Sequence, residues 1–128
     1  MNLNEWANEI HQNAVNHGFW EPKPDFNTSL MLIVGELAEA MEEHRAGRPM
    51  EYKKCIATGD VCIKMPVLCD GCMAHRMPRK PEGIAVEMID ALIRILDWCG
   101  AEGLDVERLV QEKHKYNKSR PYKHGKRY

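Results

Sequence analysis

The sequence has no apolar run approaching the roughly twenty residues that a membrane-spanning helix needs, which argues against an integral membrane protein. Its N-terminus carries neither a basic region nor an apolar core of the kind that directs secretion. We therefore expect a cytoplasmic protein without a membrane partner, whose cysteines are thiols or metal ligands rather than disulfides. Aromatic residues are few, at 7%, but 44% hydrophobic and 29% charged residues are ordinary for a globular chain.

Acidic residues are missing from the last sixteen positions, a feature that the net charge of −1 conceals. Residues 113–128 hold seven Lys or Arg, whereas residues 1–112 hold eleven of them against nineteen acids. The chain thus combines an acidic body with a basic tail, which includes the polar and basic residues 121–128. Such a tail is typical of contact with nucleic acid or an anionic membrane, or it serves solubility alone. A third explanation is a phosphorylated small ligand held between the tail and a metal-binding acidic cluster.

The chain shows no internal repeat and, outside residues 48–81, no alternating strand pattern, and its apolar residues recur at helical spacing instead. We expect four helices and an all-α fold, a four-helix bundle formed by a single domain of residues 1–128. The expected helices run from Leu3 to a C-cap at Gly18, from near Asn27, Thr28 and Ser29 to Gly47 and Pro49, from near Glu82 to near Gly100, and from an N-cap at Asp105 to before Pro121.

Residues 48–81 contain four of the five cysteines, four of the seven prolines and no sustained period. They indicate an irregular inserted loop or small subdomain between the second and third helices. Two of the cysteines stand in the Cys-x2-Cys spacing that forms half of a typical zinc site, and four thiolates would complete a structural Zn²⁺ site. The alternative is a mobile loop with free thiols. The candidate ligands are Cys55, Cys62, Cys69 and Cys72.

Two helices carry acidic stripes although their other faces are largely apolar. At 100° per residue, Glu36, Glu39 and Glu43 share one face of the second helix. Glu87 and Asp90 share one face of the third helix. A solvated face is the usual explanation of such a stripe. If the two stripes pack together, however, their charges repel unless a divalent cation binds, and all-oxygen donors favour Mg²⁺ or Mn²⁺ over zinc.

The same acidic residues resemble the signature of a known family. Glu36 and Glu39, followed by Glu87 and Asp90, look like the ExxE…ExxD pattern of the MazG-like, all-α nucleoside triphosphate pyrophosphohydrolases. The segments KPEGIAVE and YNKSRPYKHGK resemble the same family. The separation between the two acidic motifs is longer than is usual, and many members have a further acid where this chain has Gly35, which leaves the number of metal ions open. The likeness covers roughly residues 5–46 and 80–126.

The resemblance implies a MazG-like bundle that hydrolyses nucleoside triphosphates to the monophosphate and pyrophosphate, a step of nucleotide-pool housekeeping. The cofactor would be Mg²⁺, with Mn²⁺ as a substitute, and Glu39 would orient or deprotonate the attacking water. Glu43 is either a reserve ligand or a solvated acid. A homodimer or homotetramer is expected, because one short chain buries little core and the family resemblance implies it as well. The implied metal ligands are Glu36, Glu39, Glu87 and Asp90.

Five further residues are candidates for substrate binding. Lys113, Asn117 and Arg120 resemble the substrate-contacting helix end of the family, although their cations would also complement the helix dipole. Trp20 could stack on a base and Asn27 could hydrogen bond to its edge, but tryptophan more often packs in a core.

Two other classes of function stay open at this point. The first is a zinc-stapled protein whose basic tail binds nucleic acid, a partner that the enzyme hypothesis does not require. The second is a family member that binds nucleotides without hydrolysing them.

Overall fold

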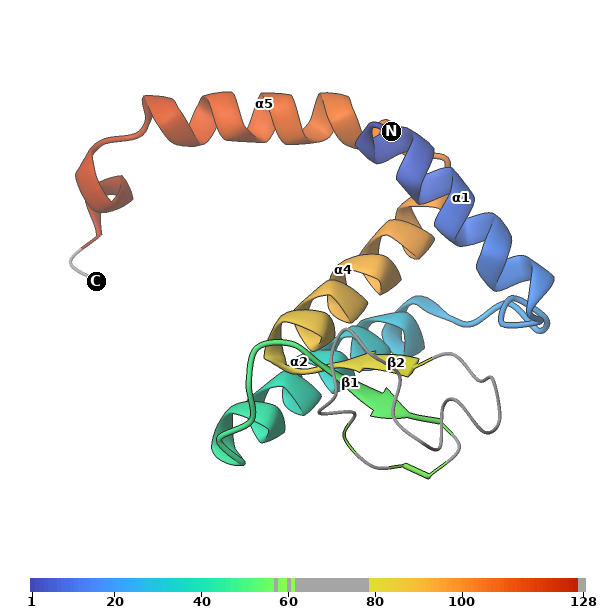
Figure 1. Ribbon diagram of the computed structural model, residues 1–128. Coiled ribbons are helices and arrows are strands. Elements are labelled where there is room, and N and C mark those ends of the chain that lie inside the picture. Colours follow the sequence, from blue (N-terminus) through green and yellow to red (C-terminus); the bar gives the residue numbers. More distant parts are fainter. Residues whose placement is uncertain (57, 60, 62–78, 127–128) are drawn as a thin grey trace. The chain divides into compact units, whose positions relative to one another are not determined.

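The computed structural model describes the chain apart from residues 57, 60, 62–78 and 127–128, and the described part is mainly helical (Figure 1). Its elements are α1 (Leu3–Asn16), α2 (Phe26–Arg45), β1 (Tyr52–Cys55), β2 (Arg79–Glu82), α4 (Ile84–Ala101), α5 (Val106–Ser119) and the 3₁₀ helix η1 (Tyr122–Gly125). The four expected helices are present, and a small two-stranded sheet is added to them. None of the helices described is both long and apolar enough to reach across a lipid bilayer.

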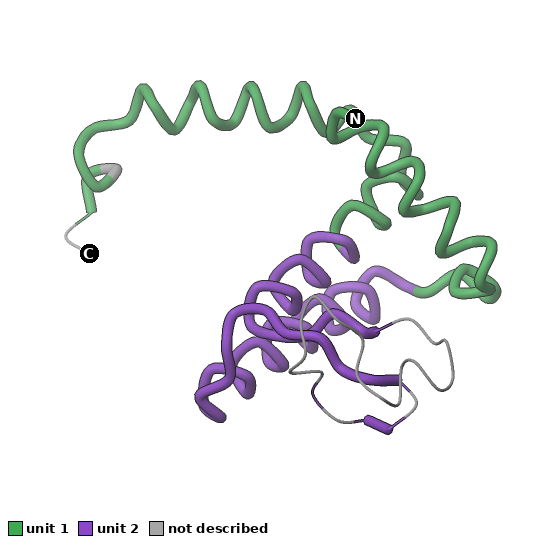
Figure 2. Tube along the Cα trace, viewed as in Figure 1, with its two compact units in different colours: residues 1–24, 95–128 green, residues 25–94 purple. Residues whose placement is uncertain are grey.

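The chain divides into two compact units (Figure 2). We call residues 1–24 and 95–128 the terminal unit and residues 25–94 the central unit. Helix α4 is continuous and contributes its first part to the central unit and its last turns to the terminal unit. The single domain expected from the sequence stays a prediction.

The acidic helix of the central unit, α2, begins slightly earlier than the sequence predicts. Its N-cap is Asp25, whose carboxylate accepts a hydrogen bond from the Thr28 N–H at 2.7 Å. Asn27 consequently lies exposed in the first turn instead of capping the helix. The helix ends at Arg45, and Gly47 follows with φ at 68°, the left-handed conformation of the predicted stop.

Residues 48–81 are not irregular throughout, contrary to the expectation from the sequence. Strand β1 pairs with β2 in an antiparallel ladder, in which Tyr52 lies opposite Glu82 and Cys55 lies opposite Arg79. Strand β1 thus follows α2, and strand β2 leads into α4. Glu82, which the helical pattern places at the start of the third helix, is therefore the last residue of a strand.

A tight junction separates β2 from α4 and fixes where α4 begins. Gly83 has φ at 121°, a conformation that side-chain-bearing residues rarely adopt. A Cβ atom at this position would run into the carbonyl group of Met50. That carbonyl accepts a hydrogen bond from the Ala85 N–H at 3.0 Å, so the helix start is tied to the chain that follows α2.

The terminal unit is built around a small apolar core between α1, the last turns of α4 and the start of α5. Gly100 allows the backbone of Ala7 to lie close against α4. The first turn of α1 is also linked to α5, because the Leu3 N–H donates to Glu107 at 2.6 Å and Asn4 accepts from the Val106 N–H at 2.7 Å. The buried core residues are Ala7, Leu96, Cys99 and Val106.

Both ends of α5 lie where the sequence predicts. The carboxylate of Asp105 caps the helix by accepting a hydrogen bond from the Arg108 N–H at 3.2 Å. The helix ends at Ser119, ahead of Pro121, because the residue before a proline avoids the helical conformation.

Candidate metal centre

Helices α2 and α4 bring three of the predicted metal ligands into one cluster. Glu36 and Glu39 lie one turn apart on α2, and Glu87 lies on the part of α4 that belongs to the same unit. One carboxylate oxygen from each lies within 4.8 Å of the other two. We call these residues the first triad. Carboxylate oxygens at this spacing are suited to a hard divalent cation.

Glu87 is the most deeply buried member of the first triad, with 5% of its surface exposed. Its Oε2 atom has no hydrogen-bond partner in the described part of the chain. Burial raises the pKa of Glu87 from 4.5 to about 8, with a hydrogen bond to Glu39 as the next cause. The charges of Glu39, Asp90 and Glu82 also raise this pKa. The metal-free chain therefore keeps a proton on Glu87 at neutral pH, which a cation would displace.

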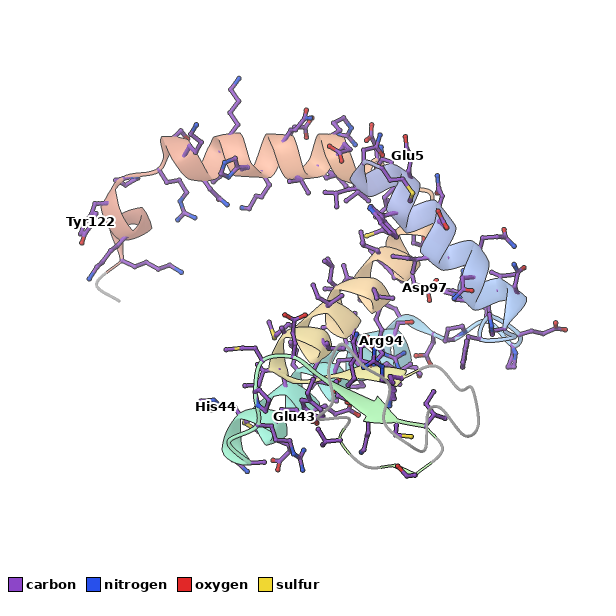
Figure 3. The ribbon with its side chains drawn as sticks, viewed as in Figure 1. Glu5, Glu43, His44, Arg94, Asp97 and Tyr122 are labelled. Atoms are coloured by element: carbon purple, nitrogen blue, oxygen red, sulfur yellow. The ribbon has the colours of Figure 1, made fainter. Side chains whose placement is uncertain are left out.

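Asp90, the fourth predicted ligand, lies one turn after Glu87 but is not a member of the triad. Burial raises the pKa of Asp90, and the charges of Glu36 and Glu82 raise it further, while Arg94 lowers it. The guanidinium Nε of Arg94, which is labelled in Figure 3, donates to Glu36 Oε1 at 2.6 Å. Arg94 thus neutralises the side of the cluster nearest Glu36, and its charge does not reverse the upward pKa shift of Asp90.

Glu87 also belongs to a second triad, which it forms with Glu43 of α2 and Glu82 of β2. One carboxylate oxygen from each lies within 4.8 Å of the others, and all three residues are buried. The interpretation of Glu43 as a solvated acid is therefore wrong. The helical pattern does not identify Glu82 as a candidate ligand. Its only local signal is Gly83, because a glycine at this point is typical of a break between a strand and a helix.

Polar side chains from the two strands and from the chain just after α2 pair with two carboxylates of the second triad. The Tyr52 hydroxyl donates to the two carboxylate oxygens of Glu43 at 3.0 and 3.1 Å, and Arg48 donates to the same residue at 3.2 Å. The ammonium group of Lys80 lies 2.9 Å from Glu82 Oε1. These contacts leave the Oε2 atom of Glu87 without a hydrogen-bond partner in the described part of the chain.

A pocket of about 350 Å³ opens between α2, β2 and α4 within the central unit. Members of both triads line it together with Lys80, so its walls carry several carboxylates and one ammonium group. Such a pocket can admit a hydrated cation and an anionic group bound to it. The lining residues are Ala38, Glu39, Glu42, Glu43, Lys80, Glu82 and Glu87.

The predicted substrate-binding residues of the basic segment lie in the terminal unit. Lys113 and Asn117 line a largely apolar pocket of about 490 Å³ formed with Trp98 and Leu109. The Lys113 ammonium is 5.1 Å from the ring centroid of Tyr116. Both residues of the predicted pair thus lie on one side of α5, as their spacing of four requires.

Arg120 is the C-cap of α5, and its backbone N–H donates to the carbonyl of Asn117 at 3.2 Å. Its guanidinium carbon is 5.7 Å from the ring centroid of Tyr116. The side chain therefore lies against the last turn of the helix, where cations also complement the helix dipole.

Trp20 is held in the terminal unit by polar contacts that the sequence does not reveal. Its indole N–H donates to the two oxygens of Asp97 at 3.0 and 3.1 Å. His11 lies 2.8 Å from the same carboxylate and meets the Trp20 ring edge-on, at 4.8 Å between ring centroids. A half-buried Trp20 with its N–H engaged has a structural role in this unit, whereas Asn27 is exposed on α2 in the other unit.

The cysteines of the predicted zinc site are only partly within the described chain. Cys55 is 1% exposed at the end of β1. Cys62, Cys69 and Cys72 lie outside the described residues, so the Zn²⁺ site stays a prediction. Cys99 lies in the core of the terminal unit, and burial raises the pKa of its thiol.

Comparison of the chain with protein-family models, with curated proteins and with solved structures finds no match.

Proposed function

We propose that the chain is a Mg²⁺-dependent nucleoside triphosphate pyrophosphohydrolase with a MazG-like helical bundle, acting in the cytoplasm on nucleotide pools. The observation that carries the proposal is the first triad, in which Glu36, Glu39 and Glu87 converge from two helices. The buried Glu87 oxygen without a hydrogen-bond partner supports a cation there, because a bound ion would satisfy it. The resemblance of the ExxE and ExxD motifs supplies the reaction.

The first triad and Asp90 would hold Mg²⁺, or Mn²⁺ in its place. When bound, the ion neutralises phosphate charge and makes a coordinated water more acidic. Glu39 is exposed, unlike Glu87, and lines the 350 Å³ pocket. It is thus the carboxylate that can meet a water entering from solvent, and it would orient this water or accept its proton during attack on the α-phosphorus.

Binding of the nucleotide itself is assigned on the resemblance. Lys113 and Arg120 would contact phosphate oxygens, the first as a point charge and the second through its planar fork of donors. Asn117, Asn27 and Trp20 would contact the nucleoside. The polar partner of Trp20 supports a fixed ring orientation, which stacking on a base would require.

The test of the proposed function is pyrophosphate release from a panel of canonical and modified nucleoside triphosphates with Mg²⁺. We expect Glu39→Gln to lower the turnover rate by about 100-fold or more, because the amide cannot accept the proton of water. Glu9→Gln makes the same charge change at an exposed position of α1 and should leave the rate unchanged.

Absence of pyrophosphate with every nucleotide, together with no effect of Glu39→Gln, would exclude the enzyme. Calorimetry with an αβ-non-hydrolysable triphosphate then distinguishes the alternatives. Binding without turnover indicates a non-catalytic nucleotide-binding protein. Salt-sensitive binding of DNA or RNA that is lost on deletion of residues 121–128 indicates the nucleic-acid-binding protein.

We also propose that the chain is a homodimer or homotetramer. Many large apolar side chains on α2 and on the first part of α4 are exposed. So many exposed apolar side chains on two helices are unusual for the surface of a monomer. A second copy would remove them from water at a gain of about 25 cal/mol per Å². The exposed residues are Leu30, Met31, Val34, Leu37, Met41, Met88, Ile89, Leu92 and Ile93.

Light scattering should therefore give at least twice the mass of one chain. Met31→Lys is expected to shift this mass toward the monomer, because it puts a charge into the apolar surface of α2. Met50→Lys is the matched control, since Met50 is 62% exposed and Met31 is 63% exposed but Met50 lies outside the helices. A monomeric wild-type chain would contradict the proposal.

A further inference from the structure

The second triad has the composition of a binding site rather than of a surface acidic patch. Its three carboxylates come from three different elements, namely Glu43 of α2, Glu82 of β2 and Glu87 of α4. Their exposed fractions are only 7%, 8% and 5%. Glutamates are almost never buried to this extent unless they are paired or bind a metal, because removing a charge from water is costly.

The protein provides cationic or hydroxyl partners for two of the three carboxylates. Glu43 receives Tyr52 and Arg48, and one oxygen of Glu82 receives Lys80. Both cations sit at the rim, where their side chains are 53% and 65% exposed. The buried Oε2 of Glu87 receives no donor from the described chain. The cluster therefore lacks a partner for one oxygen of its most deeply buried residue.

A divalent cation matches what is missing more closely than the other candidates do. The donors are carboxylate oxygens only, the set that Mg²⁺, Mn²⁺ and Ca²⁺ prefer and that zinc rarely uses alone. The 350 Å³ pocket reaches all three residues, so an ion could enter with part of its water shell. Lys80 does not close this route, because its long side chain is mostly solvated and holds one oxygen of Glu82.

We propose that Glu43, Glu82 and Glu87 form a second divalent-cation site, and that Glu87 bridges it to the cation of the first triad. The bridging role rests on the proposed function, which assigns the first cation. The unpartnered Oε2 of Glu87 supports a cation in either triad, whereas the convergence of Glu43, Glu82 and Glu87 belongs to the second triad alone. Two cations joined by one carboxylate form the paired arrangement that serves phosphoryl transfer, with one ion on the attacking oxygen and one on the leaving side. Because Glu82 belongs to β2, binding would also tie the base of the 48–81 segment to both helices.

The test is a titration of the full, nucleotide-free chain with Mn²⁺, followed by calorimetry and by electron paramagnetic resonance. We expect two Mn²⁺ per chain and a spectrum broadened by coupling between them. Glu82→Gln should bind one Mn²⁺ and give the six-line spectrum of an isolated ion. Glu51→Gln removes an exposed carboxylate next to β1 and should still bind two.

Lys80 provides a variant that acts in the opposite direction. Lys80→Gln removes the ammonium group that competes for Glu82, so we expect the weaker of the two Mn²⁺ dissociation constants to fall by about tenfold. This result cannot come from a damaged fold, which would weaken binding. A single Mn²⁺ on the wild-type chain, or two on Glu82→Gln, would overturn the second site, as would weaker or unchanged binding by Lys80→Gln.

Failure of this site and failure of the proposed function give different results. Two coupled Mn²⁺ ions without pyrophosphate release from any nucleotide would leave the site in place and remove the function. Pyrophosphate release by a chain that binds only one Mn²⁺ would support the function and remove the second site.

Discussion

Replacement of Glu87 by glutamine is expected to stabilise the metal-free chain at pH 8 and to remove its stabilisation by Mg²⁺. The pKa of Glu87 in the fold is raised to about 8 from an ordinary 4.5, with burial as the main cause. Below pH 4.5 the residue is protonated in both the folded and the unfolded chain and costs nothing. Between these two values the unfolded chain releases the proton and the folded chain keeps it, so the free energy of unfolding falls as the pH rises.

The measurement is thermal unfolding in a chelator from pH 5 to pH 8, repeated with Mg²⁺. We expect the wild-type Tm to fall by about 5 °C or more over this range, and Mg²⁺ to restore it mainly at the upper end. Glu87→Gln carries no titrating proton, so its Tm should depend less on pH and should not respond to Mg²⁺. Glu9→Gln, on the exposed side of α1, should behave as the wild type does.

Two outcomes would contradict this account. If the wild-type Tm does not change between pH 5 and pH 8, the pKa of Glu87 is not raised by its burial in the folded chain. If Mg²⁺ stabilises Glu87→Gln as much as the wild type, the cation binds elsewhere. Asp90, whose pKa is raised mainly by burial, leaves a smaller dependence of the same sign in the variant.

The convergence of Glu36, Glu39 and Glu87 could be predicted from the sequence because it depends on helical spacing and on the packing of two helices, although Asp90, predicted with them, is not in the triad. Glu36 and Glu39 are three residues apart, and the apolar residues around them define which face they occupy. Pairing this face with that of Glu87 requires only that two apolar helices pack together. The same logic located the N-cap Asp105 and the end of α5, which depend on one residue type each.

The second triad could not be predicted, because it depends on the register of two strands far apart in the sequence. Tyr52 and Glu82 are opposite each other in the ladder, and neither strand has the alternation that reveals a sheet. The helical pattern of the third helix also continues backward into Glu82, which made a helix start the natural expectation. The contact of Trp20 with Asp97 is hidden for a similar reason, since it joins the turn after α1 to helix α4.

Gly100→Ala is expected to lower the free energy of unfolding by about 2–4 kcal/mol, the range of a severe steric change in a core. A Cβ atom at Gly100 would lie 2.5 Å from the carbonyl oxygen of Ala7 and 2.7 Å from Cβ of His11. Because the nearest atom belongs to the backbone of α1, it cannot rotate away. Helix α1 would have to shift from α4 and open the core around Ala7 and Leu96.

The matched control is Gly35→Ala, a change of the same kind within α2, where a Cβ atom would meet nothing within 4 Å. Helix propensity alone predicts that both variants are stabilised by about 1 kcal/mol, because alanine loses less backbone entropy than glycine in a helix. The contact with Ala7 predicts opposite signs, a loss for Gly100→Ala and a gain for Gly35→Ala. Urea unfolding of the two variants measures both. A gain for Gly100→Ala would show that α1 does not pack closely against the end of α4.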